Sequence, residues 1–276
     1  SDTLASNMVT SGGLKIYACA DPDIQAVVEE VFTNRENLVL TSDSGQQIQS
    51  AIVIIDSDGN VVGLAGAMGE KESNRVWNFA SRSTRQPGSS IKPLTVYGPA
   101  LDLGASPASP VLNLPIPIEG WNGGEGYPRN FSTDGDYSGV ESMRYAINRS
   151  HNTSTAHVLY EYVGIENAVK YLLMLGIEPD HILANGADVS TMKIESAPNF
   201  TKKYNAAFGA VANSGTYQEP YAFTQILNPD GTVYIDVREV QTTREVFKPS
   251  TAWMLVDMLK GCVTSGVGTG ANANFG

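Results

Sequence analysis

The sequence predicts a mixed α/β chain of the α+β kind, without a regular β-α-β winding. Three observations predict this class. Alternating apolar runs open the chain, helical periodicity dominates its middle, and a hairpin pattern returns late, over residues 221–237. With 276 residues, of which 42% are hydrophobic and 17% charged, the chain is long enough to bury a substantial core.

The first elements follow from local patterns. Residues 14–20 alternate as a strand does, and Asp21-Pro22 then supplies an N-cap followed by a proline at the first helical position. A helix is expected over 22–33, with one buried stripe made of Ile24, Val27, Val28 and Val31. The polar residues 1–13 are interpreted as a linker or an artificial chain end.

A hairpin is expected next. Residues 50–56 and 61–67 are β-rich, and the Asp-Gly turn between them favours antiparallel strands. After Pro87-Gly88 a helix is expected to run to about Gly104, with Pro93 tolerated in its first turns. Residues 105–130, rich in proline and glycine, predict a long surface loop of the kind that frames a cleft. Further helices are expected over 140–148, from 152 onward, and over 165–175, 201–215 and 249–261.

Composition excludes several classes of function. The formal net charge of −11 argues against nucleic acid as a partner and against docking on anionic lipid. Two cysteines, Cys19 and Cys262, give neither a disulfide framework nor metal-ligand spacing, and we expect both to be unpaired. No apolar run approaches the length of about 20 residues that a membrane span needs. No His-Glu-x-x-His occurs either, so no metal site is expected.

Ser89 and Lys92 form a candidate nucleophile and base. Residues three apart on a helix share a face, and a helix N-terminus has backbone N–H groups able to stabilise an oxyanion. Desolvation lowers the pKa of a half-buried lysine, so its neutral form can accept the serine proton in acyl transfer. The alternative interpretation is a serine N-cap beside a solvated lysine.

A second Ser-x-x-Lys occurs at Ser190–Lys193. No turn glycine precedes it and the surrounding periodicity is weak, so we interpret it as a chance match. Among the histidines, His157 lies on an apolar helical stretch and is expected to be a packing residue.

Ser150-His151-Asn152 lies between two expected helices, in a short connection able to project Ser150 and Asn152 into a cleft. The hydroxyl could relay a proton, and the carboxamide could hold a substrate carbonyl or the lysine. The alternative is ordinary capping of the second helix.

Taken together, residues 85–93 ("RQPGSSIKP") followed by "SHN" resemble the first two active-site motifs, S-x-x-K and S-x-N, of penicillin-binding protein transpeptidases. The resemblance covers almost the whole chain. Residues 12–32 resemble the opening of this domain in the bifunctional, class A members, and 127–152 resemble the approach to the second motif. Residues 206–221 and 250–270 resemble a later helix and the segment ahead of the third motif.

The third motif of the family, K-T-G, is not in the sequence, and Gly268-Thr269-Gly270 has no lysine to replace it. We therefore interpret residues 1–276 as one transpeptidase domain, incomplete at its C-terminal end, and expect a C-terminal fragment carrying K-T-G as a partner. The resemblance implies a central antiparallel sheet flanked by helices, with an α-rich subdomain that carries Ser150 and Asn152.

The activity that the resemblance implies is peptidoglycan D,D-transpeptidation on D-Ala-D-Ala stem peptides, with carboxypeptidase hydrolysis as a side activity. Ser89 would be acylated, Lys92 would accept its proton, Ser150 would relay a proton and Asn152 would bind substrate. β-Lactam antibiotics would acylate the same serine. No metal or organic cofactor is implied.

The resemblance places the parent protein outside the cytoplasm on a membrane anchor. Two alternatives stay open. One is a β-lactam-hydrolysing or sensing relative of the same fold, and the other is a non-catalytic binding or scaffolding module.

Overall fold

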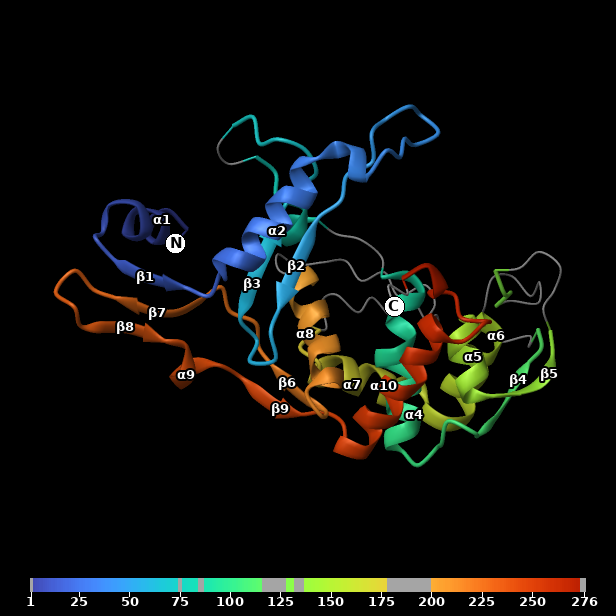
Figure 1. Ribbon diagram of the computed structural model, residues 1–276. Helices are drawn as coiled ribbons and strands as arrows, with labels where there is room; N and C mark the ends of the chain where they lie inside the picture. The colour runs from blue at the N-terminus through green and yellow to red at the C-terminus, as the bar shows by residue number, and fades with distance from the viewer. Residues whose placement is uncertain are drawn as a thin grey trace. The chain divides into compact units, whose positions relative to one another are not determined.

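The computed structural model describes residues 2–73, 76–83, 87–115, 128–131, 137–177 and 200–273 (Figure 1). Contacts divide the chain into two compact units, each assembled from three separate stretches. Unit 1 comprises Ser1–Ser83, Ala197–Gly209 and Gln218–Thr243. Unit 2 comprises Thr84–Ser196, Ala210–Tyr217 and Arg244–Gly276. The mixed α/β class predicted from the sequence is confirmed.

Unit 1 contains a three-stranded antiparallel sheet in the order β1-β7-β8. Its strands are β1 (Lys15–Ala18), β7 (Phe223–Leu227) and β8 (Val233–Asp236). The expected first strand and late hairpin are thus confirmed, and they pair with each other although about 200 residues separate them in the sequence. Helix α1 (Asp2–Ser11) occupies most of residues 1–13, which are expected from their polar sequence to be a linker or an artificial chain end.

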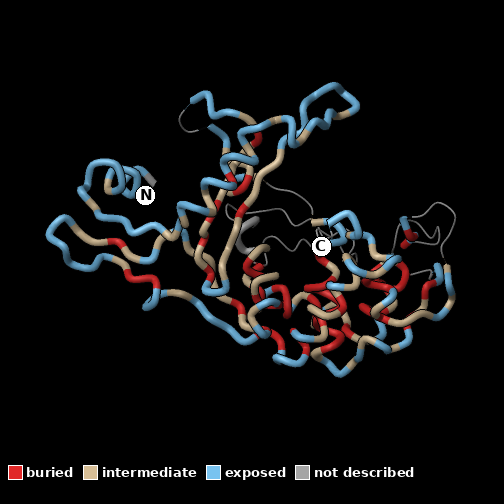
Figure 2. Tube along the Cα trace, viewed as in Figure 1, coloured by how far each residue is buried: buried red, intermediate tan, exposed pale blue. Residues whose placement is uncertain are grey.

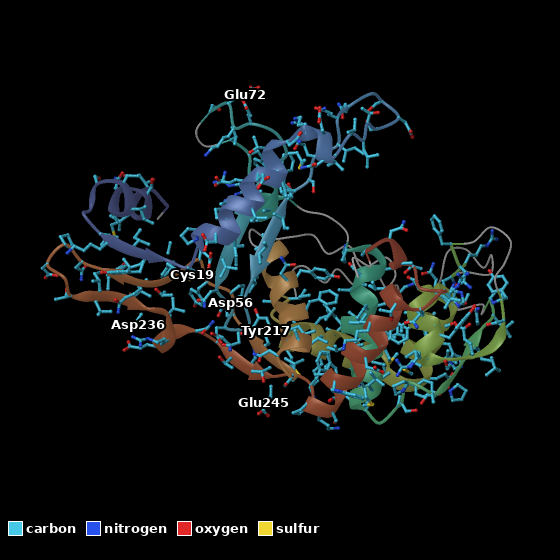
Figure 3. All side chains as sticks on the ribbon, in the orientation of Figure 1. Cys19, Asp56, Glu72, Tyr217, Asp236 and Glu245 are labelled. Atoms are coloured by element: carbon cyan, nitrogen blue, oxygen red, sulfur yellow. The ribbon has the colours of Figure 1, made fainter. Side chains whose placement is uncertain are left out.

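The hairpin expected between residues 50 and 67 is confirmed as β2 (Ile52–Ile55) and β3 (Val61–Ala65), paired antiparallel. Asp56 (Figure 3) shapes its turn, since one carboxylate oxygen accepts hydrogen bonds from the backbone N–H groups of Asp58 and Asn60. Gly59 has φ +85° in this turn, a conformation that favours glycine.

Helix α2 (Pro22–Thr33) begins as predicted, because the Asp21 carboxylate accepts hydrogen bonds from the N–H groups of Asp23 and Ile24. The predicted buried stripe is wrong at two positions. Val28 is buried, whereas Val27 is 59% exposed and Val31 is 44% exposed. The helix lies against β3, where a Cβ on Gly63 would come within 2.9 Å of Ile24 Cγ2 and 3.5 Å of Val28 Cγ2, so Ile24 and Val28 are the predicted residues that approach this glycine.

The remaining elements of unit 1 are short. They are η1 (Arg35–Asn37), α3 (Phe79–Arg82) and α9 (Val237–Val240). Helix α8 (Phe200–Ala212), expected over 201–215, contributes residues to both units, and so do the paired strands β6 (Thr216–Gln218) and β9 (Thr243–Glu245).

Unit 2 is mostly helical. Its helices are η2 (Gly88–Ile91), η3 (Pro93–Tyr97), α4 (Gly98–Asp102), α5 (Met143–Arg149), α6 (Asn152–Val158), η5 (Leu159–Val163), α7 (Ile165–Met174), α10 (Pro249–Thr264) and η7 (Ala271–Ala273). The helix expected from Gly88 to about Gly104 is therefore present, but it passes through 3₁₀, π and α geometry along its length.

The segment η3–α4 is the centre of unit 2. All nine residues from Pro93 to Leu101 are buried, and α5, α6, α7 and α10 all contact this segment. Figure 2 shows the buried residues gathered in these helices. A helix buried on every side is held rigidly by packing, which fixes the position of the Ser89–Lys92 turn that leads into it.

Two expectations for unit 2 need correction. Residues 105–130 do not form one continuous loop, because β4 (Pro110–Asn113) lies within them. Residues 140–142 are not helical, because β5 (Gly139–Ser142) pairs with β4 in an antiparallel register. The Ser142 hydroxyl accepts a hydrogen bond from the Tyr145 N–H, so α5 begins only at Met143.

Candidate active site

Ser89 lies in a 3₁₀ turn at the entrance to the central helical segment. Gly88, which precedes it, has φ +57°, and the Lys92 N–H donates to the Ser89 carbonyl. Side chains three apart eclipse each other in a 3₁₀ turn, so the spacing of Ser89 and Lys92 stacks them on one face. Ser89 is exposed, and within the described parts of the chain its hydroxyl has no hydrogen-bond partner. It is therefore accessible to a ligand.

Among the described residues, the ammonium of Lys92 has three acceptors, which belong to Ser150 and Asn152. Its Nζ lies 2.6 Å from Asn152 Oδ1, 2.8 Å from the Ser150 carbonyl oxygen and 3.3 Å from Ser150 Oγ. Burial lowers the pKa of Lys92 from 10.5 to about 8, because the charged form loses water. With this pKa about a tenth of the Lys92 side chains are neutral at pH 7, far more than at the ordinary lysine pKa.

Ser150 ends α5 in a left-handed conformation, with φ 55° and ψ 36°. Side chains other than glycine rarely adopt this region, and such outliers cluster at functional sites. The N–H groups of Ser150 and His151 donate to the carbonyls of Ile147 and Ala146, which closes the end of α5. The turn lets α6 begin at Asn152 and directs the Ser150 hydroxyl toward Lys92.

The Asn152 carboxamide bridges two parts of unit 2. Its Oδ1 accepts from Lys92, while its Nδ2 donates to the Arg129 carbonyl at 2.7 Å. Of the two roles considered from the sequence, the structure therefore shows contact with the lysine. One hydrogen of the NH₂ group remains to donate to another acceptor.

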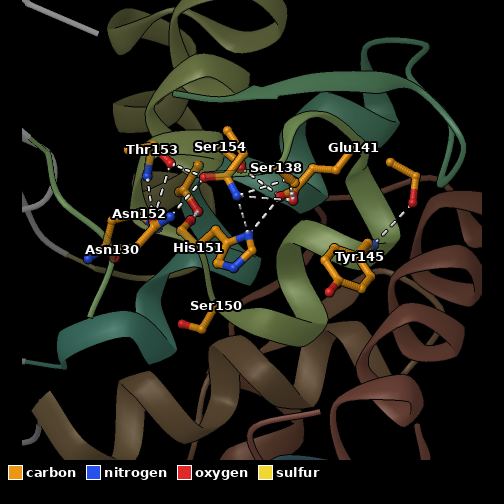
Figure 4. A network of polar contacts seen from close by, with 12 residues as sticks. Asn130, Ser138, Glu141, Tyr145, Ser150, His151, Asn152, Thr153 and Ser154 are labelled. Carbon is orange, nitrogen blue, oxygen red and sulfur yellow. Dashed lines mark hydrogen bonds and ion pairs between the residues drawn. The ribbon is translucent and has the colours of Figure 1, made fainter. Parts of the chain in front are cut away.

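A buried polar network lies behind the tripeptide (Figure 4). His151 is 4% exposed, and its Nδ1 lies 2.8 Å from Glu141 Oε1. The Glu141 carboxylate also accepts hydrogen bonds from the hydroxyls of Ser138 and Ser154, each at 2.7 Å. Burial raises the pKa of Glu141, but these three donors outweigh it and leave that pKa below the usual value, so the carboxylate is ionised.

Two asparagines extend the network to the start of α6. Asn130 Oδ1 accepts from the N–H groups of Asn152 and Thr153, at 2.8 and 3.2 Å. His151, at the N-cap position, makes no capping bond with its own side chain. Asn130 thus caps α6 from outside the helix and is held in turn by Asn113, whose Oδ1 accepts from Asn130 Nδ2 at 2.8 Å.

Sequence reasoning missed Asn113, Asn130 and Glu141. Asn113 carried a usable signal, because a polar residue in the apolar run 111–114 demands a partner if the strand is buried. Asn130 and Glu141 carried none, since their roles depend on elements that meet only in the folded chain.

The other candidates lie apart from this site. His157 is on α6, where burial lowers its pKa and its ring meets Tyr162 edge to face at 6.3 Å, in line with a packing role. Cys19 (Figure 3) and Cys262 are both free, as expected. Arg85, His181 and the Ser190–Lys193 match lie outside the described residues. In the described ranges, no group of three or more His, Cys, Asp and Glu side chains is placed to hold a metal ion.

An exposed serine thus precedes, by one 3₁₀ turn of the backbone, a lysine of lowered pKa whose amine contacts a second hydroxyl. Residues 49–276 match the family described as the penicillin-binding protein transpeptidase domain. The chain belongs to this family. Both motifs, Ser89–Lys92 and Ser150–Asn152, lie within the matched region.

Curated relatives of this transpeptidase domain are named penicillin-binding protein 1A. The chain is 29% identical to that of Clostridium acetobutylicum over 290 residues, and 31% identical to that of Clostridium botulinum strain Hall over 282 residues. Each alignment covers 100% of this chain, but only 35% and 33% of the relative. The chain thus spans about a third of the length of the curated relatives it matches.

Solved transpeptidase structures share the fold. PonA1 of Mycobacterium tuberculosis in complex with penicillin V superposes with a TM-score of 0.71 at 18% identity, covering 95% of this chain and 69% of PonA1. Penicillin-binding protein 1A of Haemophilus influenzae gives 0.64 at 21% identity, covering 84% and 39%. The fold implied by the resemblance is confirmed. Among the helices in the described ranges, none has the length and apolarity to cross a membrane.

Proposed function

We propose that this domain is a peptidoglycan D,D-transpeptidase that forms an acyl-enzyme on Ser89. The observation that carries the proposal is the position of Lys92. Lys92 follows an exposed serine by one 3₁₀ turn of the backbone, and its amine is partly neutral because of burial and contacts a second hydroxyl. A nucleophile beside a base that is itself oriented by a third group is the general arrangement for covalent acyl transfer.

Acylation follows from these contacts. Lys92 takes the proton of Ser89 while Ser89 Oγ attacks the carbonyl of the penultimate D-Ala of a stem peptide. The bond to the terminal D-Ala breaks, and the leaving amine receives a proton from Lys92 through the Ser150 hydroxyl, which lies 3.3 Å from Nζ. D-Ala departs and an ester remains on Ser89.

Deacylation reverses the proton path. An amine of a second stem peptide attacks the ester, its proton passes to Lys92, and the Ser89 oxygen recovers a proton as the new peptide bond forms. Water in place of the amine gives carboxypeptidase hydrolysis. The remaining N–H of the Asn152 carboxamide is suited to hold a carbonyl of the acyl chain.

β-Lactams are proposed as inhibitors that acylate the same serine. Relatives of this fold are described in complex with penicillin V and as an imipenem acyl-enzyme complex. The amide of the four-membered ring would open on Ser89 with no leaving group, so the adduct keeps the whole mass of the drug. Because stem peptides are assembled into the cell wall outside the cytoplasm, the proposed site of action is the outer face of the cell membrane.

Intact-mass spectrometry of the protein with benzylpenicillin tests the proposal. A stable adduct of one penicillin is expected on the wild type and none on Ser89→Ala. Ser90→Ala is the matched control, because the neighbouring hydroxyl donates to the Pro87 carbonyl and should not be needed. An adduct that disappears within minutes would indicate a β-lactam-hydrolysing enzyme instead. No adduct on the wild type, even with the expected C-terminal fragment carrying K-T-G supplied, would favour a non-catalytic binding module.

A further inference from the structure

The middle residue of the Ser150–Asn152 tripeptide faces the opposite way from its neighbours. Ser150 and Asn152 contact Lys92, whereas the His151 ring enters the buried network with Glu141 (Figure 4). A histidine and a glutamate that are 4% and 5% exposed in their side chains are costly to bury unless they are paired. The burial of this pair therefore points to a structural or functional role for it.

Ser150 needs support, because its left-handed backbone is disfavoured for any side chain with a Cβ. The two hydrogen bonds that close α5 come from backbone groups and would form equally well with other side chains at these positions. His151 directly follows Ser150, and its side chain is anchored in the interior by its contact with Glu141. Its ring fixes the direction in which the backbone leaves Ser150.

Glu141 makes the anchor rigid by joining separate elements. It lies on β5, and it accepts hydrogen bonds from Ser154 on α6 and from Asn113 on β4, whose Nδ2 is 3.2 Å from Oε2. Asn113 Nδ2 also approaches His151 Nδ1 at 3.1 Å, but its two hydrogens have Ser138 Oγ and Glu141 Oε2 as acceptors. Because the ionised Glu141 carboxylate only accepts hydrogen bonds, its 2.8 Å contact requires the His151 proton on Nδ1, and this bond orients the ring.

We propose that His151 and Glu141 are positioning residues that hold Ser150 in its left-handed conformation with its hydroxyl against Lys92. The inference rests on the acyl transfer proposed above, in which this hydroxyl carries a proton. Proton relay requires hydrogen-bond reach, and the Ser150 Oγ to Lys92 Nζ distance of 3.3 Å leaves little margin. A shift of about 1 Å in such a group costs about 100-fold in rate.

Acylation kinetics with benzylpenicillin test the proposal. They give two separate quantities, the dissociation constant of the initial non-covalent complex and the rate constant of acylation. His151→Ala, Glu141→Ala and the double variant should each lower the rate constant by about 10-fold to 100-fold, with the dissociation constant within about threefold of wild type. Because the two residues act as one unit, the double variant should be no slower than the slower single variant.

Two further variants separate positioning from general loss of stability. In His151→Asn, the amide nitrogen of the new side chain takes the place of Nδ1 and can donate to Glu141, so acylation should stay within about fivefold of wild type. Ser142→Ala removes the N-cap of α5 at the end of the helix opposite Ser150, and its rate constant should be unchanged. Wild-type kinetics in His151→Ala, a His151→Asn as slow as His151→Ala, or an equal loss in Ser142→Ala would overturn the proposal.

A measurement that needs no acylation distinguishes this inference from the function on which it rests. NMR titration of ¹³C-labelled lysine should place the pKa of Lys92 near 8 in the wild type and in His151→Asn. In His151→Ala the loosened tripeptide admits water, and the pKa should move toward 10.5. If the wild type is not acylated even with the expected K-T-G fragment supplied, the proposed function fails, while this titration still decides the inference. An unchanged Lys92 titration in His151→Ala would refute the anchor.

Discussion

The pH dependence of Ser89 acylation is the sharpest prediction of the structure, because it depends on a single ionisation. Burial lowers the pKa of Lys92 from 10.5 to about 8. Only the neutral amine can accept the serine proton, so the acylation rate should follow the neutral fraction of Lys92. The rate should rise tenfold per pH unit at first and level off above pH 8.

The magnitude follows from the two pKa values. At pH 7 a lysine of pKa 8 is about 9% neutral, whereas one of pKa 10.5 is about 0.03% neutral, so burial raises the available base about 300-fold. Between pH 6 and pH 9 the neutral fraction grows from about 1% to about 91%, which predicts an increase of about 90-fold in rate.

Stopped-flow or quenched-flow acylation by benzylpenicillin from pH 6 to pH 10 measures this profile, with circular dichroism at each pH to verify folding. Lys92→Arg serves as the control, because a guanidinium stays charged throughout this range and should give a slow reaction without the rise. A wild-type rate that is flat from pH 6 to pH 9, or that still climbs tenfold per unit at pH 10, would refute a base of lowered pKa at Lys92.

Four further predictions concern stability and are measured by urea or thermal unfolding. Ser150→Gly should be more stable than Ser150→Ala by about 1 kcal/mol, since both lose the hydroxyl but only alanine strains the left-handed backbone; equal stabilities would contradict that strain. Asn130→Ala should cost about 1–2 kcal/mol through the lost cap of α6, and a cost near zero would exclude the capping role. The free energy of unfolding of the wild type should increase by up to about 3 kcal/mol relative to Lys92→Met as pH rises from 8 to 10.5. In that range the unfolded lysine binds a proton that the folded lysine has lost. A constant difference between the two proteins would count against the lowered pKa of Lys92. Glu141 has a folded pKa below its unfolded value, so it stabilises the protein above about pH 4.5 and loses that contribution as pH falls through the folded pKa. The difference in unfolding free energy between wild type and Glu141→Gln should therefore narrow in acid. A difference that widens in acid would show that the pKa of Glu141 is raised on folding.

The sequence by itself determined most of the local elements and the two motifs that contain Ser89, Lys92, Ser150 and Asn152. Asp21-Pro22 begins a helix and the Asp-Gly turn joins β2 to β3, while Ser89 and Lys92 are predicted from their spacing to be a nucleophile and base. These features depend on residues within one turn of each other, so their physics is visible in the order of the amino acids. The two motifs together also identified the family, which the match over residues 49–276 confirmed.

Tertiary structure decided which groups meet. Val140 was assigned to a helix by its spacing, but it lies in β5, because pairing with β4 satisfies its backbone better than an isolated first turn would. The sequence paired Lys92 with Ser89, whereas the folded chain places its amine on Ser150 and Asn152, nearly 60 residues away. Glu141 and Asn130 gained their roles in the same way. Burial and hydrogen bonding between distant segments set these partners and the pKa of Lys92, and neither can be read from local spacing.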